Sequence, residues 1–183
     1  MTGRLPQLSA EEEAGILAGV RAGGEARRAA MERLWRSLRE PLLALCLHVT
    51  GRAADAEDAV QAVLVAVHRG LPAFHGASRL TTWAYRIALR ASFQASARRR
   101  DGVSLDRQLP GGGGEAEVAT RDRARRAAAA VARLPAEPRA VLSLFAIEGL
   151  SHREIADILG VPEGTIWSRL QAARKAMLEA VDA

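Results

Sequence analysis

The side chains best suited to chemistry in this sequence are arginines interleaved with aromatic rings. Between Arg69 and Arg100 there are seven arginines and neither an aspartate nor a glutamate, and the aromatic residues of the stretch are Phe74, Trp83, Tyr85 and Phe93. Arginine contacts phosphate, and aromatic rings stack on unpaired bases, so the combination suits single-stranded nucleic acid. The alternative is structural: the rings form a core, as we expect of Tyr85 and Phe93, and the arginines are a solvated face.

A second candidate for nucleic-acid binding lies near the C-terminus. Ser151 and Glu154 form the S-x-x-E pattern of a helix start, Gly160 supplies a turn, and Pro162 suits the first position of another helix. A short helix, a glycine turn and a longer helix with a polar face predict a helix-turn-helix, whose second helix can enter the major groove. The alternative is a packed helical hairpin with a solvated outer face.

The second helix of this motif has two faces of different character. Its apolar face consists of Ile166, Leu170, Ala173 and Met177. On the outward face we expect base contacts and, beside them, contacts to phosphate or to a protein partner. The base-reading candidates are Trp167, Ser168 and Gln171, and the others are Arg169, Arg174 and Lys175.

Residues for catalysis or metal binding are not grouped in the sequence. The four histidines, at positions 48, 68, 75 and 152, have no metal-ligand spacing. The glycines at 111–114 lack the lysine and the preceding strand of a phosphate-binding loop. We therefore expect no catalytic residue, no metal and no cofactor, and a protein that is not an enzyme.

Composition limits the class of protein further. The 183 residues allow one medium domain or two small ones, and the net charge of +5 suits a polyanionic partner, although a merely basic protein would share it. The single cysteine, Cys46, fits a reducing compartment. No run approaches the roughly 18 apolar residues of a membrane span. We expect a cytoplasmic protein that does not insert into membranes.

Apolar spacing and helix-capping residues predict helices throughout. Asp55 is expected to cap the third helix, whose apolar stripe is Val60, Val63, Leu64 and Val67, and Pro41 is expected to kink or break the second. We predict an all-α protein with two small helical domains, 1–100 and 123–183, joined by a flexible, glycine-rich linker at 101–122. The predicted helices are 9–23, 25–49, 55–69, 82–99, 121–134, 137–148, 152–159 and 163–180.

Three motifs, in this order, resemble the extracytoplasmic-function (ECF) sigma factors. Residues 55–61 resemble the signature D-A-E-D-x-V-Q, and residues 74–88 resemble F-x-G-x-S-x-x-x-T-W-L-Y-R-I-A. Residues 134–135 and 148–166 look like the family's fourth region. The resemblance covers nearly the whole chain, with a linker where the family has one. The chain departs from the family at Ala62, Leu64 and Trp167, where an acidic residue, a phenylalanine and a basic residue are usual.

The resemblance implies a sigma factor that directs core RNA polymerase to specific promoters. Polymerase would bind Asp55, Glu57, Asp58 and Gln61. The minus-ten element would be melted, with one base flipped out, by Phe74, Ser78, Thr82, Trp83, Arg86 and Arg90, and the helix-turn-helix would read the minus-thirty-five element. Core polymerase and promoter DNA are the implied partners, and an anti-sigma factor is common in the family.

Two alternatives remain open from the residues. A free-standing helix-turn-helix regulator explains residues 121–180 but leaves residues 55–61 and the arginine-rich stretch unexplained. A structural or adaptor protein explains only the helices.

Overall fold

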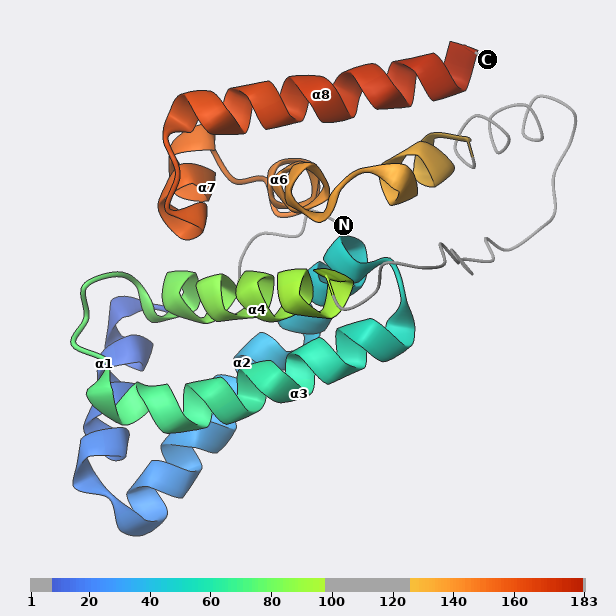
Figure 1. The fold of residues 1–183 in the computed structure, drawn as a ribbon. Helices are drawn as coiled ribbons and strands as arrows, with labels where there is room; N and C mark the ends of the chain where they lie inside the picture. Colours follow the sequence, from blue (N-terminus) through green and yellow to red (C-terminus); the bar gives the residue numbers. More distant parts are fainter. Residues whose placement is uncertain (1–7, 98–125, 183) are drawn as a thin grey trace, which may run out of the picture.

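The computed structural model describes residues 8–97 and 126–182, with side chains as far as residue 180. All regular structure in these residues is helical (Figure 1). This confirms the all-α class, whereas the predicted linker at 101–122 lies outside the described residues. The elements are α1 (Ala10–Ala22), α2 (Gly24–Thr50), α3 (Ala53–Gly70), the short 3-10 helix η1 (Leu71–Ala73), α4 (Leu80–Ala97), a helical stretch at 126–133, α6 (Ala136–Ala146), α7 (His152–Leu159) and α8 (Glu163–Asp182).

The long helix α2 runs through Pro41 without interruption, so the predicted break is absent. Proline inside a helix costs about 3 kcal/mol because it removes one hydrogen bond and crowds the preceding turn. Burying a leucine side chain contributes roughly 1.5–3 kcal/mol. Leu34, Leu38, Leu42 and Leu45 are all at most 2% exposed, so the packing of this face outweighs the cost of the proline.

Helix α3 begins earlier than predicted. Arg52 is its N-cap and Ala53 its first residue, so Asp55 lies inside the first turn and does not cap the helix. The reason is the tight connection: Gly51, at φ 76°, ends α2, and only Gly51 and Arg52 separate the two helices. Of the predicted apolar stripe of α3, Leu64 is wrong, because 37% of it is exposed.

The first four helices form one unit around α2, which packs against α1, α3 and α4. The close contact with α1 depends on glycine. A Cβ atom added at Gly19 would lie 2.8 Å from the Cβ of Ala30, closer than packed carbon atoms approach. The remaining core includes Tyr85 of α4, which is fully buried, as expected from the sequence.

The second unit, residues 126–182, lies directly against the first (Figure 1). Helix α6 packs on α2, and α7 packs on α4. Leu144 and Ile155 of the second unit belong to the same buried cluster as Leu45 and Tyr85 of the first. The sequence predicts two tethered domains and gives no sign of this shared core.

Candidate polymerase and promoter contact surfaces

The predicted polymerase-contact residues form a strip along α3. Glu57, Asp58 and Gln61 are exposed, while Asp55 is half-buried and lies 3.9 Å from the guanidinium of Arg52. Because α3 begins at Ala53, Glu57 and Asp58 fall in its second turn, where the helix dipole favours acidic side chains only weakly. A requirement of the helix start therefore explains them only weakly.

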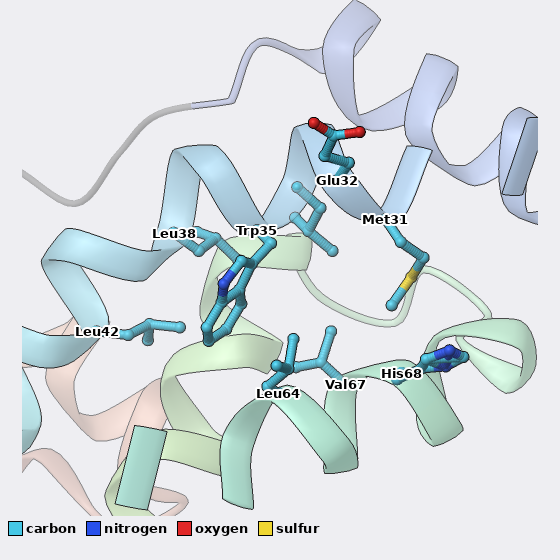
Figure 2. Close-up of a pocket in the computed structure, with 9 residues that line it drawn as sticks. Met31, Glu32, Trp35, Leu38, Leu42, Leu64, Val67 and His68 are labelled. Carbon is cyan, nitrogen blue, oxygen red and sulfur yellow. The ribbon is translucent and has the colours of Figure 1, made fainter. Parts of the chain in front are cut away.

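This strip continues into an apolar surface. Leu64 and Val65 are 37% and 48% exposed and lie about two turns beyond Glu57 and Asp58. Beside Leu64 lies a groove of about 200 Å³ between α2 and α3, and Trp35 and Met31 form its other wall (Figure 2). The departure from the family at Leu64 thus falls on a surface. Trp35 is half-buried, and no motif in the sequence marks it as part of this surface.

The minus-ten candidates begin with two aromatic rings in contact. The ring centroids of Phe74 and Trp83 are 5.3 Å apart and their planes are tilted by 47°. Both residues are half-buried against the core. A Cβ atom added at Gly70 would lie 2.9 Å from the Trp83 ring, so this glycine at the end of α3 provides the space for the indole. The pair is thus part of the structure, and both rings remain partly exposed.

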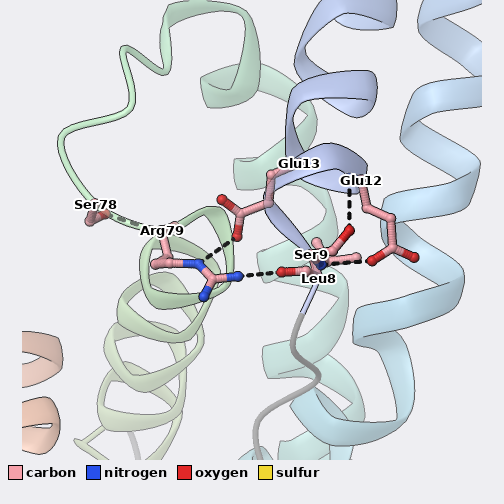
Figure 3. Close-up of polar contacts among 6 residues, drawn as sticks. All are labelled: Leu8, Ser9, Glu12, Glu13, Ser78 and Arg79. Atoms are coloured by element: carbon pink, nitrogen blue, oxygen red, sulfur yellow. Dashed lines mark hydrogen bonds and ion pairs between the residues drawn. The ribbon is translucent and has the colours of Figure 1, made fainter.

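The loop between these rings is fixed by a residue that the sequence analysis did not single out. The guanidinium of Arg79 donates to Glu13 at 3.1 Å and to the backbone carbonyl of Leu8, and both acceptors lie at the start of α1 (Figure 3). The Ser78 hydroxyl donates to the carbonyl of Arg79 at 3.3 Å. Glu13 and Arg79 are 66 residues apart, so no local pattern could have paired them.

The arginines of α4 point away from the core. Arg86 and Arg90 are both exposed, one turn apart, and Thr82 lies half-exposed one turn before them. Arg86 donates two hydrogen bonds, of 3.1 and 2.6 Å, to the backbone carbonyl of Asp157 on α7. The structure therefore places a predicted DNA contact of the first unit directly against the second unit.

The helix-turn-helix is formed as predicted. Ser151 and Glu154 make a capping box: the backbone N–H of Ser151 donates to the Glu154 carboxylate at 2.9 Å, and that of Glu154 donates to the Ser151 hydroxyl at 3.3 Å. Gly160, at φ 67°, makes the turn. Ile155 and Ile166 are completely buried and hold α7 against α8.

The outward face of α8 carries most of the predicted minus-thirty-five residues. Trp167 is 58% exposed, and four further side chains beside it are exposed: Ser168, Gln171, Arg174 and Lys175. Arg169 differs, because its side chain is only 21% exposed and pairs with Glu137 at the start of α6. The structure thus brings five of the six predicted residues to one open face and directs the sixth towards α6.

A first prediction separates base reading from phosphate contact on this face. Gln171→Ala should weaken binding to the preferred upstream element by about 1–3 kcal/mol and relax choice at one base position, because an amide can pair with an adenine edge. Arg174→Ala is its matched control. It should weaken binding to all upstream elements alike and lower the slope of log affinity against log salt concentration by about 1. Binding of both variants to a library of upstream elements at two salt concentrations measures this. An equal loss on every sequence for Gln171→Ala would contradict it.

A buried carboxyl group lies where the two units meet. Glu148, after α6, is 5% exposed, and burial raises the pKa of its carboxyl group. Burial also raises the pKa of the Tyr85 hydroxyl, and the nearby Glu148 charge adds to that shift. The Tyr85 hydroxyl has no hydrogen-bond partner in the described part of the chain. The contact between the units therefore includes buried polar groups, whose removal from water costs stability.

A second prediction concerns the pH dependence of this contact. A carboxyl group whose pKa is raised by folding favours the folded state at a pH below its ordinary value and loses that contribution as the pH rises. Glu148→Gln should remove the cost of burying the charge, so it should stabilise the chain at pH 7 relative to the parent by about 1 kcal/mol and less at pH 4. Urea unfolding at both values measures the difference. If Glu148→Gln changed the free energy of unfolding equally at pH 4 and pH 7, the prediction would be contradicted.

Residues 8–97 and 126–182 contain no group of three or more histidine, cysteine, aspartate or glutamate side chains that could hold a metal ion. Within the same ranges, no helix is long and apolar enough to cross a membrane.

Comparisons with known proteins identify both units. Residues 34–101 match the family described as Sigma-70 region 2, and residues 124–177 match Sigma-70, region 4. The chain is 31% identical over 149 residues to the ECF RNA polymerase sigma factor SigM of Mycobacterium tuberculosis, covering 80% of this chain and 74% of that protein. It is 30% identical over 137 residues to the ECF RNA polymerase sigma-E factor of Escherichia coli K12, covering 67% and 72%.

The fold is similar to that of a solved complex. The structure of CnrH in complex with the cytosolic domain of CnrY has a TM-score of 0.67 and 23% identity, covering 93% of this chain and 97% of that one. This likeness concerns the fold, whereas the relatives and the two matched regions identify the family. With the acidic strip, the arginine-bearing helix and the helix-turn-helix in the family's order, the chain belongs to the ECF RNA polymerase sigma factors.

Proposed function

We propose that this sigma factor, which directs RNA polymerase to promoters, divides the work among three surfaces. The strip at Asp55, Glu57, Asp58 and Gln61 binds the core enzyme, the region from Phe74 to Arg90 opens the minus-ten element, and the outer face of α8 reads the minus-thirty-five element. The observation that supports this division best is the exposed acidic strip of α3, because a free-standing regulator has no use for it.

Binding to the core enzyme combines electrostatic attraction with burial of an adjacent apolar surface. The exposed carboxylates of Glu57 and Asp58 complement a basic partner surface and favour a fast, oriented encounter. Leu64 and Val65 extend the same face and can bury apolar area against the partner. The charges of the strip thus orient the approaching partner, and the apolar residues beside it form a contact that excludes water.

Promoter opening requires capture of an unpaired strand. We assign Phe74, Ser78, Thr82 and Trp83 to the pocket that receives a flipped base, and Arg86 and Arg90 to the phosphates beside it. Flipping costs a few kcal/mol, least where the duplex is already weak, so a pocket of this kind selects sequence and opens the duplex together. The Arg79 contacts with α1 hold the loop of this pocket in place.

The upstream element is assigned to Trp167, Ser168, Gln171, Arg174 and Lys175 of α8. Arg169, paired with Glu137, instead holds α8 against α6 and contributes to DNA binding through the position of that helix. The units extend over residues 1–100 and 123–183, with a linker at 101–122. The matched regions at 34–101 and 124–177 support this division.

An anti-sigma factor is the proposed regulatory partner. One similar fold belongs to the sigma factor RpoE of Bartonella quintana in complex with the anti-sigma factor NepR, with a TM-score of 0.62. We place the chain in the cytoplasm, where its polymerase works, and assign it no catalytic residue, because the chemistry of transcription belongs to the core enzyme.

The deciding experiment is transcription in vitro. Core RNA polymerase supplied with the pure protein and a library of promoter fragments should start transcripts at discrete sites, and core enzyme alone should not. A protein that binds duplex DNA but starts no transcript with core polymerase would contradict the proposal and favour the free-standing regulator.

A further inference from the structure

The two units of the chain meet along surfaces that both contribute to promoter recognition. Helix α7, the first helix of the helix-turn-helix, packs on α4, which carries the minus-ten arginines (Figure 1). A cleft of about 560 Å³ lies between them. Its wall on the first unit includes Ser78, Thr82 and Arg86, all assigned to the minus-ten element, and its wall on the second includes Glu154 and Asp157 of α7.

At this cleft, Arg86 caps the C-terminal end of α7. The last carbonyl groups of a helix have no partner within it and carry a partial negative charge. In a continued helix the N–H of Val161 would bond to the carbonyl of Asp157, but here it bonds to that of Ala156. The Asp157 carbonyl instead accepts both hydrogen bonds from Arg86, at 3.1 and 2.6 Å.

This end of α7 offers Arg86 the same chemistry as a DNA phosphate. It presents a negatively polarised oxygen, and two carboxylate residues, Glu154 and Asp157, line the same cleft. A guanidinium that donates two hydrogen bonds to a carbonyl cannot keep them and bind a phosphate oxygen with the same N–H groups. The contact with α7 and a contact of the same N–H groups with the promoter strand are therefore mutually exclusive.

We propose that the free chain is locked by its own second unit, with the C-terminal end of α7 in the place of the promoter phosphate at Arg86, and that this lock opens when the two units bind their separate sites. The proposal rests on the assignment of Arg86 to the minus-ten strand. A chain that is closed 99% of the time would bind that strand about a hundredfold more weakly than its open form.

The lock can be broken from the side of α7, leaving Arg86 unchanged. Asp157 is exposed, and Asp157→Arg would place a second positive charge in the cleft beside Arg86. Glu25→Arg is the matched control, since it makes the same charge change on an exposed residue of the first turn of α2. The distance between the units can be followed by energy transfer between dyes at Ala29→Cys and Ala172→Cys, two exposed positions, because Cys46 is buried and protected from labelling.

Free parent chain and Glu25→Arg should show one short, narrow distance, and Asp157→Arg a longer and broader one. On a short fluorescent single-stranded DNA, Asp157→Arg should bind at least about tenfold more tightly than Glu25→Arg. Adding Arg86→Ala to Asp157→Arg should abolish that gain and leave the longer distance in place. Circular dichroism confirms that each variant is folded.

Three results would overturn the proposal: a free parent chain already as extended as Asp157→Arg, equal DNA affinity of Asp157→Arg and Glu25→Arg, or a gain in affinity that survives Arg86→Ala. Transcription from a discrete site distinguishes these failures from failure of the proposed function. A chain that initiates there but shows no closed state when free disproves the lock alone.

Discussion

Core RNA polymerase should retain Asp58→Arg about a hundredfold more weakly than the parent chain. Asp58 is exposed in the second turn of α3, beside Glu57, so the substitution puts a positive charge at the centre of the acidic strip. Like charges placed against each other across an interface cost several kcal/mol, and about 1.4 kcal/mol corresponds to a factor of ten in affinity. Fluorescence anisotropy of the labelled chain, titrated with core enzyme, measures the loss.

Glu25→Arg again serves as the control for this prediction. Glu25 lies at the opposite end of the antiparallel pair α2 and α3, roughly 30 Å from Asp58 at 1.5 Å of helix rise per residue. It changes the net charge equally and should leave affinity for the polymerase within about twofold, since a rim or remote charge has little effect. Equal retention of folded Asp58→Arg and Glu25→Arg would disprove the assignment of the α3 strip.

Promoter opening should fall by at least about tenfold when Arg86 and Arg90 are both changed to alanine, because two contacts to the captured strand are lost. Both arginines are exposed on α4, so their removal leaves the core intact. Duplex binding through α8 should change much less. Permanganate reactivity of unpaired thymines on a mapped promoter measures opening, and a gel-shift assay on the same fragment measures binding.

The loss of opening must be separated from the release of the proposed lock. Arg86→Ala removes both the α7 cap and a strand contact, whereas Arg90→Ala removes only the contact, so Arg90→Ala alone should also reduce opening. Arg21→Ala, an exposed arginine in the last turn of α1, is the matched control. Normal permanganate reactivity in the double variant would mean that these arginines are only a solvated face. Trp83→Ala is less informative, because the indole also packs against Phe74 and Gly70.

Features set by neighbouring residues were predictable from the sequence. The capping box at Ser151 and the glycine turn at Gly160 involve residues only a few positions apart, and both are present. Helix α7 has the predicted bounds for the same reason, since a cap at one end and a glycine at the other define it completely.

The errors occurred where distant packing outweighed a local preference. Pro41 does not interrupt α2, because buried leucines on both sides of it hold the helix together. The spacing of Leu64 matches an apolar stripe, but 37% of this residue is exposed beside the groove between α2 and α3.

Contacts across the fold could not be read from local patterns at all. The pairing of Arg79 with Glu13, of Arg169 with Glu137 and of Arg86 with the end of α7 joins residues 32 to 71 positions apart. For the same reason the sequence identified the candidate site residues by type but not which of them face one another.

The uninterrupted course of α3 has a consequence for where transcription begins. The polymerase strip starts at Asp55, and Gly70, against which Trp83 rests, lies at the other end of the same helix. Fifteen residues of helix separate these points by about 22 Å. On the proposed assignment, the length of α3 sets the distance from the enzyme to the first melted base. One residue inserted into α3 would turn its far end by about 100° and shift it by about 1.5 Å, and so move the start point of the transcript.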